Sequence, residues 1–98
     1  MKLAKEQILL PELVDKEAIQ QMSFKSPVHF KQDPEIERKI SDAMLLGNSY
    51  HTKVSIVFCD DEGLKRVNTT IWAKGNKFIC LKGGMWLPIE RIAVIELI

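Results

Sequence analysis

Few residues of this chain are of the types that carry out chemistry. There are two histidines, His29 and His51, and two cysteines, Cys59 and Cys80. None of the four lies within the short spacing by which metal ligands are recognised in a sequence. The sequence therefore predicts no metal site, and it favours two reduced, buried thiols over a disulfide.

The remaining patterns do not assemble a catalytic group. The sequence has neither a serine in a glycine-flanked elbow nor a cysteine close to a histidine. The acidic triplet Asp60, Asp61 and Glu62 lacks the spaced ligands of a calcium loop, so we interpret it as a solvated hairpin tip. The stretches AKGNK and KGGMW do not open a helix, as a phosphate-binding loop must. We therefore predict no catalytic residues, no cofactor and no enzymatic activity.

One stretch offers a candidate binding surface. In the predicted strand LKRVNTTIWA, alternation with a period of two places Val67, Thr69 and Ile71 on the core face. The opposite face then carries a tryptophan beside cations, which suits stacking on a base or anchoring a protein contact. This candidate binding patch consists of Arg66, Asn68, Trp72, Lys74 and Lys77.

A second interpretation of Trp72 stays open. The N-terminal helix or the segment SPVHF covers that face, and Trp72 then belongs to a second, smaller core. The apolar stripe of the helix must bury against something, which favours this alternative. Trp86 has two interpretations as well, as part of the core or as a subunit contact.

The second half of the chain reads as strands. KVSIVFCDDEG alternates and ends in an acidic turn, LKRVNTTIWA follows, and Gly75 and Asn76 predict a hairpin because they tolerate positive φ. FICLK, a Gly83-Gly84 turn, MWLPI, one helical turn around PIERI and AVIELI complete the pattern. Five short strands joined by short turns are antiparallel and too few for two stacked sheets. We expect them to close into a small barrel.

The first half predicts a helix over residues 34–46. Asp33 is the expected N-cap and Pro34 the first helical residue, and Gly47 with Asn48 supplies the stop. Its apolar stripe, which we expect to lie on the barrel, consists of Ile36, Ile40, Ala43 and Met44. Residues 11–22 form a possible second short helix, and residues 1–10 a tail.

Length and composition predict a single α+β domain that is mainly β. Residues 1–52 form an N-terminal extension and residues 53–98 the five-stranded antiparallel barrel. The chain is 46% hydrophobic and 28% charged, with a net charge of +1 that does not favour a dedicated nucleic-acid binder. Acids and a proline stand where a signal peptide needs apolar residues, and no stretch is long enough to span a membrane. We expect a cytoplasmic protein without membrane contact.

The stretches KVSIVFCDDEG, TTIWAKGNKFICLKGG and LPIERIAVIEL carry a resemblance to known small barrels. Over residues 53–98 the layout resembles Sm-like and Src-homology-3-like barrels, and it is similar to that of the small Rho-binding antiterminators. TTIWA, LKGG and PIERI also look like an uncharacterised bacterial family of the Bacteroidetes type. The resemblance to Sm-like barrels implies RNA or protein binding through loops and strand edges, often as rings. The usual Sm acidic-loop and RG pairs are missing, so no family site residue is carried over.

Together these patterns predict a non-catalytic binding module. We expect it to act through protein–protein contacts or self-association, with a protein or a second copy as its partner. The alternative is an RNA-binding or transcription-regulatory Sm-like protein that uses the candidate binding patch.

Overall fold

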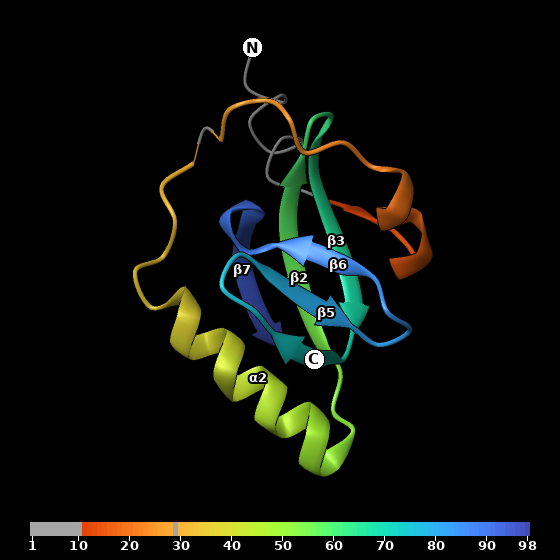
Figure 1. Ribbon diagram of the computed structural model, residues 1–98, viewed down its shortest axis with the longest axis vertical. Coiled ribbons are helices and arrows are strands. Elements are labelled where there is room, and N and C mark those ends of the chain that lie inside the picture. The colour runs from red at the N-terminus through yellow and green to blue at the C-terminus, as the bar shows by residue number, and fades with distance from the viewer. Residues whose placement is uncertain (1–10, 29) are drawn as a thin grey trace.

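The strands of this protein form two sheets that face each other, as the computed structural model shows for residues 11–28 and 30–98 (Figure 1). We call them sheet A, with strand order β1-β3-β2-β7, and sheet B, with order β4-β5-β6. Sheet A contains β1 (Glu12–Leu13), β2 (Val54–Asp60), β3 (Gly63–Thr69) and β7 (Ile92–Leu97). Sheet B contains β4 (Ile71–Lys74), β5 (Phe78–Leu81) and β6 (Trp86–Pro88). The helical elements are η1 (Lys16–Gln21), α2 (Ile36–Tyr50) and η2 (Ile89–Arg91).

The architecture is α+β and mainly β as predicted, but the closed five-stranded barrel is wrong. The described residues form seven strands in two open sheets. The difference has two local causes: β1 joins β3 as a parallel strand, and the predicted run LKRVNTTIWA divides into β3 and β4. The predicted hairpins β2–β3, β4–β5 and β5–β6 are antiparallel, and the helical turn around PIERI is η2. These local predictions are confirmed.

Thr70 is the joint at which the chain leaves sheet A for sheet B. Thr69 and Thr70 are both buried, although the alternation of a strand would expose one of them. The carbonyl of Thr70 accepts a hydrogen bond from the Lys82 backbone at 2.9 Å, and its hydroxyl donates to the Thr52 carbonyl at 3.4 Å. These contacts hold the bend that redirects β4 across the core.

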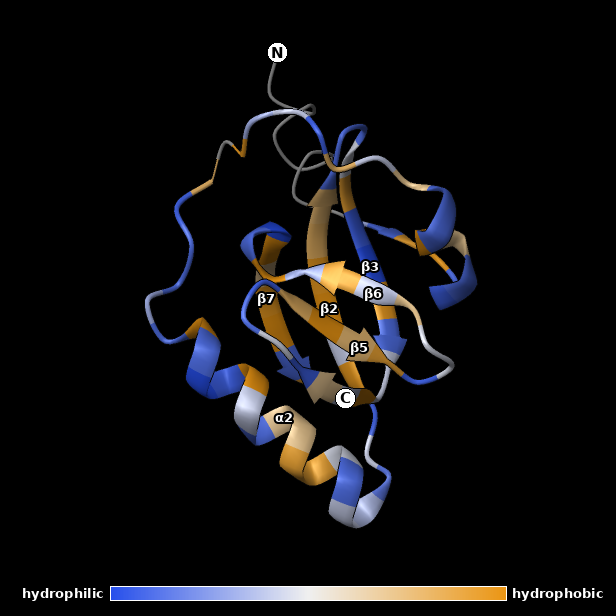
Figure 2. Cartoon of the chain, viewed as in Figure 1, coloured by the Kyte–Doolittle hydropathy of each residue, from blue (hydrophilic) through white to orange (hydrophobic). Residues whose placement is uncertain are grey.

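The core lies between the two sheets and is closed at one side by α2. Strands β2, β5 and β7 consist mainly of hydrophobic residues, whereas α2 has one apolar and one polar face (Figure 2). Fully buried side chains come from both sheets and from the helix: Ile40, Val54, Ile56, Phe58, Ile71, Ile79, Leu81, Leu87 and Ile92. The predicted helix stripe therefore packs on the sheets.

The helix is longer at its C-terminal end than predicted. It also begins two residues later than predicted: the N-cap is Glu35 rather than Asp33, although Asp33 accepts a hydrogen bond from the Glu35 backbone at 2.8 Å. At the other end α2 continues past Gly47 to Tyr50, and its C-cap is His51, whose φ is 55°. Gly47 is not a stop signal, because it is buried where the helix approaches β4. A Cβ atom at Gly47 would lie 2.6 Å from Cγ2 of Thr70 and 3.3 Å from the carbonyl of Ile71. Glycine is required there for close packing.

The N-terminal segment is held by a buried arginine rather than by a second α-helix. The possible short helix over residues 11–22 is present only as the 3-10 helix η1 at Lys16–Gln21, preceded by the two-residue strand β1, and residues 1–10 lie outside the described part of the chain. Arg91, only 2% exposed, donates to the carbonyls of Ser26 and Cys59 and lies 5.8 Å from the ring centroid of Phe24. Through these contacts Arg91 holds the residues after η1, which include Phe24 and Ser26, against the sheets.

The acidic triplet is not a fully solvated tip. Asp60 is buried and pairs with the buried Lys65 at 2.8 Å, and Asp61 accepts hydrogen bonds from the backbone of Lys25 and Ser26. Hydrogen bonds from the side chain of Ser23 and from the backbone and side chain of Ser26 hold the pKa of Asp61 well below its usual value. Burial opposes the charged form of Lys65, but the hydrogen bonds and charges of Asp60 and Glu62 outweigh it and raise the pKa of Lys65.

The turn between β5 and β6 makes a strict demand on Gly84. Its φ is +95°, and no atom lies within 4 Å of a Cβ placed there, so a substitution is strained by the backbone alone. We expect Gly84→Val to lower the free energy of unfolding by about 2 kcal/mol in urea denaturation. Gly75 is the control, because its φ is not positive, contrary to the prediction. Gly75→Ala should change the free energy of unfolding by less than about 0.5 kcal/mol. Equal midpoints for the two variants would refute the turn assignment.

Gly47→Ala should destabilise the fold although alanine is the better helix former. The clash with Thr70 should cost about 1–3 kcal/mol, more than the roughly 1 kcal/mol by which alanine favours a helix. Asn48→Ala, an exposed change on the same helix, should be neutral or slightly stabilising. Urea denaturation of both variants tests this, and a stabilised Gly47→Ala variant would contradict the close packing of α2 on β4.

Candidate functional site

The outer face of sheet B is the most unusual surface among the described residues. The inner face of this sheet carries Ile71, Ile79, Leu81 and Leu87, all without exposed surface. Because successive side chains of a strand point to opposite faces, the residues between these four point away from the core. The sequence thus supplies a rigid sheet whose inner face is anchored in the core.

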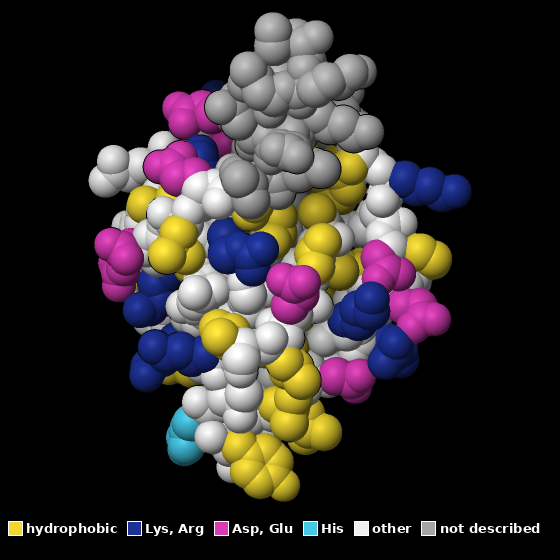
Figure 3. Space-filling model, turned by 180° about the vertical axis from the view of Figure 1, so that it is seen from behind, with side chains coloured by type: hydrophobic (Ala, Val, Ile, Leu, Met, Phe, Trp, Pro, Cys, Tyr) yellow, Lys and Arg dark blue, Asp and Glu magenta, His cyan; other side chains and the backbone are white. Residues whose placement is uncertain are grey.

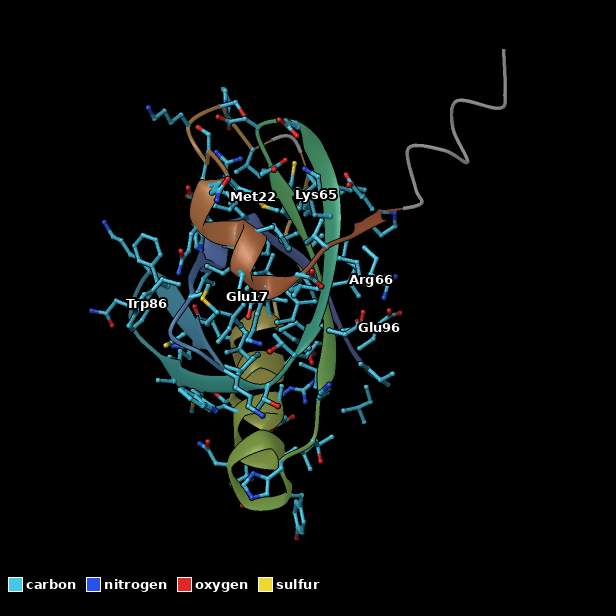
Figure 4. The ribbon with its side chains drawn as sticks, turned by 90° about the vertical axis from the view of Figure 1, so that its right-hand side faces the viewer. Glu17, Met22, Lys65, Arg66, Trp86 and Glu96 are labelled. Carbon is cyan, nitrogen blue, oxygen red and sulfur yellow. The ribbon has the colours of Figure 1, made fainter. Side chains whose placement is uncertain are left out.

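Three large aromatic side chains lie on this outer face. Trp72 is 49% exposed, Phe78 45% and Trp86 55%. Register places Cys80 opposite Trp86, and Phe78 opposite Pro88. Figure 4 shows Trp86 projecting from sheet B away from the rest of the molecule. We call Trp72, Phe78 and Trp86 the aromatic face.

A bulge in β4 contributes to the width of the aromatic face. Ile71 pairs with Leu81, but the next pair joins Ala73 to Cys80, so Trp72 and Ala73 together stand opposite one residue of β5. Both are exposed, in contrast to the buried Ile71 before them. The bulge thereby keeps Trp72 on the solvent side of the sheet.

The predicted patch is divided between the two sheets. Arg66 and Asn68 belong to β3, whereas Trp72 and Lys74 belong to β4 and Lys77 follows in the turn. In Figure 4 Arg66 and Trp86 lie on opposite sides of the molecule. The five residues of the patch are therefore not gathered on one sheet face.

Two of the predicted cations are already paired within the chain. Arg66 donates to the Ser55 hydroxyl and lies 3.2 Å from a carboxylate oxygen of Glu96 on β7. Lys74 lies 2.7 Å from a carboxylate oxygen of Glu37 on α2. The outer surface of sheet A, seen from behind in Figure 3, carries basic and acidic side chains interspersed. The described residues of this surface therefore create no field of one sign.

Sequence reasoning missed Phe78 and left Trp86 open. The alternation of the stretches FICL and WLP could have identified both residues. The buried members of these stretches are Ile79, Leu81 and Leu87, so Phe78 and Trp86 fall on the opposite, outer face. The prediction that the N-terminal half covers Trp72 is wrong for the described residues, because α2 packs against the side of β4 instead. That packing satisfies the helix stripe and leaves the tryptophan in solvent.

A second surface lies along β7. This strand pairs with β2 and is the last strand of sheet A among the described residues. A groove of about 490 Å³ runs between it and α2, lined by residues that include Ala43, Leu46, Ile95 and Leu97. Both cations of its lining are paired, Arg38 with Glu35 and Asp42 and Lys39 with Asp33, and most of the remaining lining is apolar.

Residues that hold metals or act as nucleophiles are scattered. The described part of the chain contains no group of three or more His, Cys, Asp and Glu residues that could hold a metal ion. His51 follows α2 as its C-cap, and His29 lies outside the described residues. Cys59 and Cys80 are free thiols, as predicted, but they are half-buried rather than buried.

Comparisons with protein-family models, with curated proteins and with solved structures gave no match. Within residues 11–28 and 30–98, no helix is both long and apolar enough to cross a membrane.

The exposure of the two tryptophans can be measured separately. Trp72→Phe and Trp86→Phe each leave one tryptophan, and in each variant we expect red-shifted emission that acrylamide quenches readily, because both indoles are about half exposed. The urea-unfolded protein serves as the reference for full exposure. Blue-shifted, protected emission from either variant would show that its tryptophan is covered.

Proposed function

We propose that this chain is a non-catalytic binding module that holds a protein partner on the aromatic face. The observation that carries the proposal is three half-exposed aromatic side chains on one face of a three-stranded sheet. Large aromatic residues are the usual anchors of protein interfaces, and exposed apolar surface of this kind marks interaction sites.

Rigidity supports the proposal. The inner face of sheet B is fully buried, so the strands that carry the aromatic residues are held in place before a partner arrives. A preorganised surface loses less conformational entropy on binding than a flexible one. The two free cysteines favour a reducing compartment, which supports a cytoplasmic location.

Kinship with the Sm-like and Src-homology-3-like barrels is part of the proposal. Three features support this kinship: the order of the strands along the chain, the bend between β3 and β4, and the helical turn η2 before the last strand. In this chain the barrel is opened into two sheets.

RNA binding is the alternative that the aromatic face also supports, because bases stack on exposed aromatic rings. The cations of the predicted patch support RNA binding less than the aromatic rings do. Arg66 is paired with Glu96 on sheet A, and Lys74 is paired with Glu37. Since affinity for nucleic acid depends on the number of phosphates neutralised, the remaining lysines of sheet B supply only a weak contribution.

Removing the two indoles should abolish partner binding without unfolding the domain. We expect Trp72→Ala/Trp86→Ala to keep its thermal midpoint within a few degrees, because both side chains are half exposed. In affinity capture under native conditions, the double variant should no longer retain the partner that wild type binds. Cysteine alkylation gives a second readout: because Cys80 lies opposite Trp86, a partner bound to wild type should slow the alkylation of Cys80 but not of Cys59.

Tyr50→Ala is the matched control, because Tyr50 is an exposed aromatic residue at the end of α2. Its captured proteins should equal those of wild type. The proposal fails if the double variant retains the same partner, or if the partner leaves the alkylation rate of Cys80 unchanged. A concentration-dependent dimer in light scattering, lost in the double variant, would instead identify a second copy as the occupant.

A further inference from the structure

Sheet B differs in charge from the rest of the chain. Residues 71–88 contain Lys74, Lys77 and Lys82 and no acidic residue. The remainder of the chain holds the other eleven Lys/Arg and all thirteen Asp/Glu, so it is net −2. The segment that forms the sheet with the aromatic face therefore carries a surplus of three positive charges, one of which, on Lys74, is paired with Glu37.

Two of these lysines are available to a partner. Lys74 is paired with Glu37, whereas the described residues offer no ion pair to Lys77 or Lys82. Lys77 precedes β5 and Lys82 follows it, and both are exposed. Five positions of extended chain separate them by about 17 Å, with the rings of the aromatic face between the two ends.

From this arrangement, and resting on the proposed function, we infer that the partner segment is an acidic amphipathic α-helix. Its apolar stripe packs on Trp72, Phe78 and Trp86. Carboxylates near its two ends meet Lys77 and Lys82, which at 1.5 Å per residue requires acids about eleven residues apart.

The edges of sheet B argue against an added strand. The β4 edge is occupied by α2, through the Lys74–Glu37 ion pair and the packing of Gly47 on Thr70. The β6 edge is three residues long and ends in Pro88, which has no backbone N–H to donate. A partner must therefore lie over the side chains, and a helix does so with its own backbone hydrogen bonds already made.

Charge also argues against a second copy as the occupant. Two aromatic faces packed about a two-fold axis would bring Lys77 and Lys82 against a segment, residues 71–88, that carries three lysines and no acid; the acids nearest to it, Glu37 and Glu90, lie beside Lys77 at one end of the sheet. Like charges brought together across an interface weaken it and exclude the wrong partner. A surface rich in carboxylates is the complementary one.

An unbiased selection tests the chemistry of the partner. A displayed library of helical peptides of about 18 residues, long enough to sustain a helix, would be selected against immobilised wild-type protein and against Lys77→Glu/Lys82→Glu. Wild type should enrich an apolar stripe with Asp or Glu at both ends, and the charge-reversed variant should enrich Lys or Arg at the same positions. A selected peptide should bind Lys77→Gln/Lys82→Gln about fivefold more weakly than wild type.

Lys25→Glu is the matched control, since Lys25 is an exposed lysine in the loop beside Asp61; it should enrich the same peptides as wild type. Enriched peptides with an apolar stripe but no preference for acids would overturn the acidic helix and leave the proposed function standing. No enrichment over Trp72→Ala/Trp86→Ala would overturn both. Quenching of the indoles by single-stranded RNA, or a dimer that buries them, would also overturn the acidic helix.

Discussion

The bend at Thr70 is the constraint on which the rest of the structure depends. It divides one continuous run of strand residues between two sheets, so that the core is enclosed from both sides by a short chain. The bend is held by backbone and side-chain hydrogen bonds of Thr70 and by the close approach of α2 at Gly47. Any side chain at Gly47 would meet Thr70, so the helix and the bend are a single packing unit.

The bend also determines which residues share a surface. Without it, Arg66 and Trp72 would point to the same side, since they are an even number of positions apart. With it, Arg66 crosses β2 to Glu96 on the outside of sheet A, while Trp72 joins Phe78 and Trp86 on the outside of sheet B. The aromatic face is thus a product of tertiary structure as much as of composition.

Two charged side chains, the buried Arg91 and the exposed Asp61, hold the N-terminal segment against this framework. Arg91 reaches carbonyls on two separate segments, and Asp61 accepts backbone hydrogen bonds from the loop after η1. A buried charge such as that of Arg91 is costly unless it is hydrogen-bonded, so its carbonyl partners are strongly specified. Sequence inspection assigned Asp60 and Asp61 to a solvated turn because acids usually are exposed, and it had no means of seeing Lys65 or the loop.

The sequence by itself determined the local elements: the strands from their period of two, the presence of α2 from its apolar stripe, and the turn at Gly84 from its need for positive φ. These depend on neighbours along the chain. Only the tertiary structure decided how strand runs divide into sheets, why Gly47 lies within a helix, and which exposed side chains stand together. Those outcomes depend on contacts between residues far apart in sequence, such as Thr70 with Gly47, whose energies no local pattern contains.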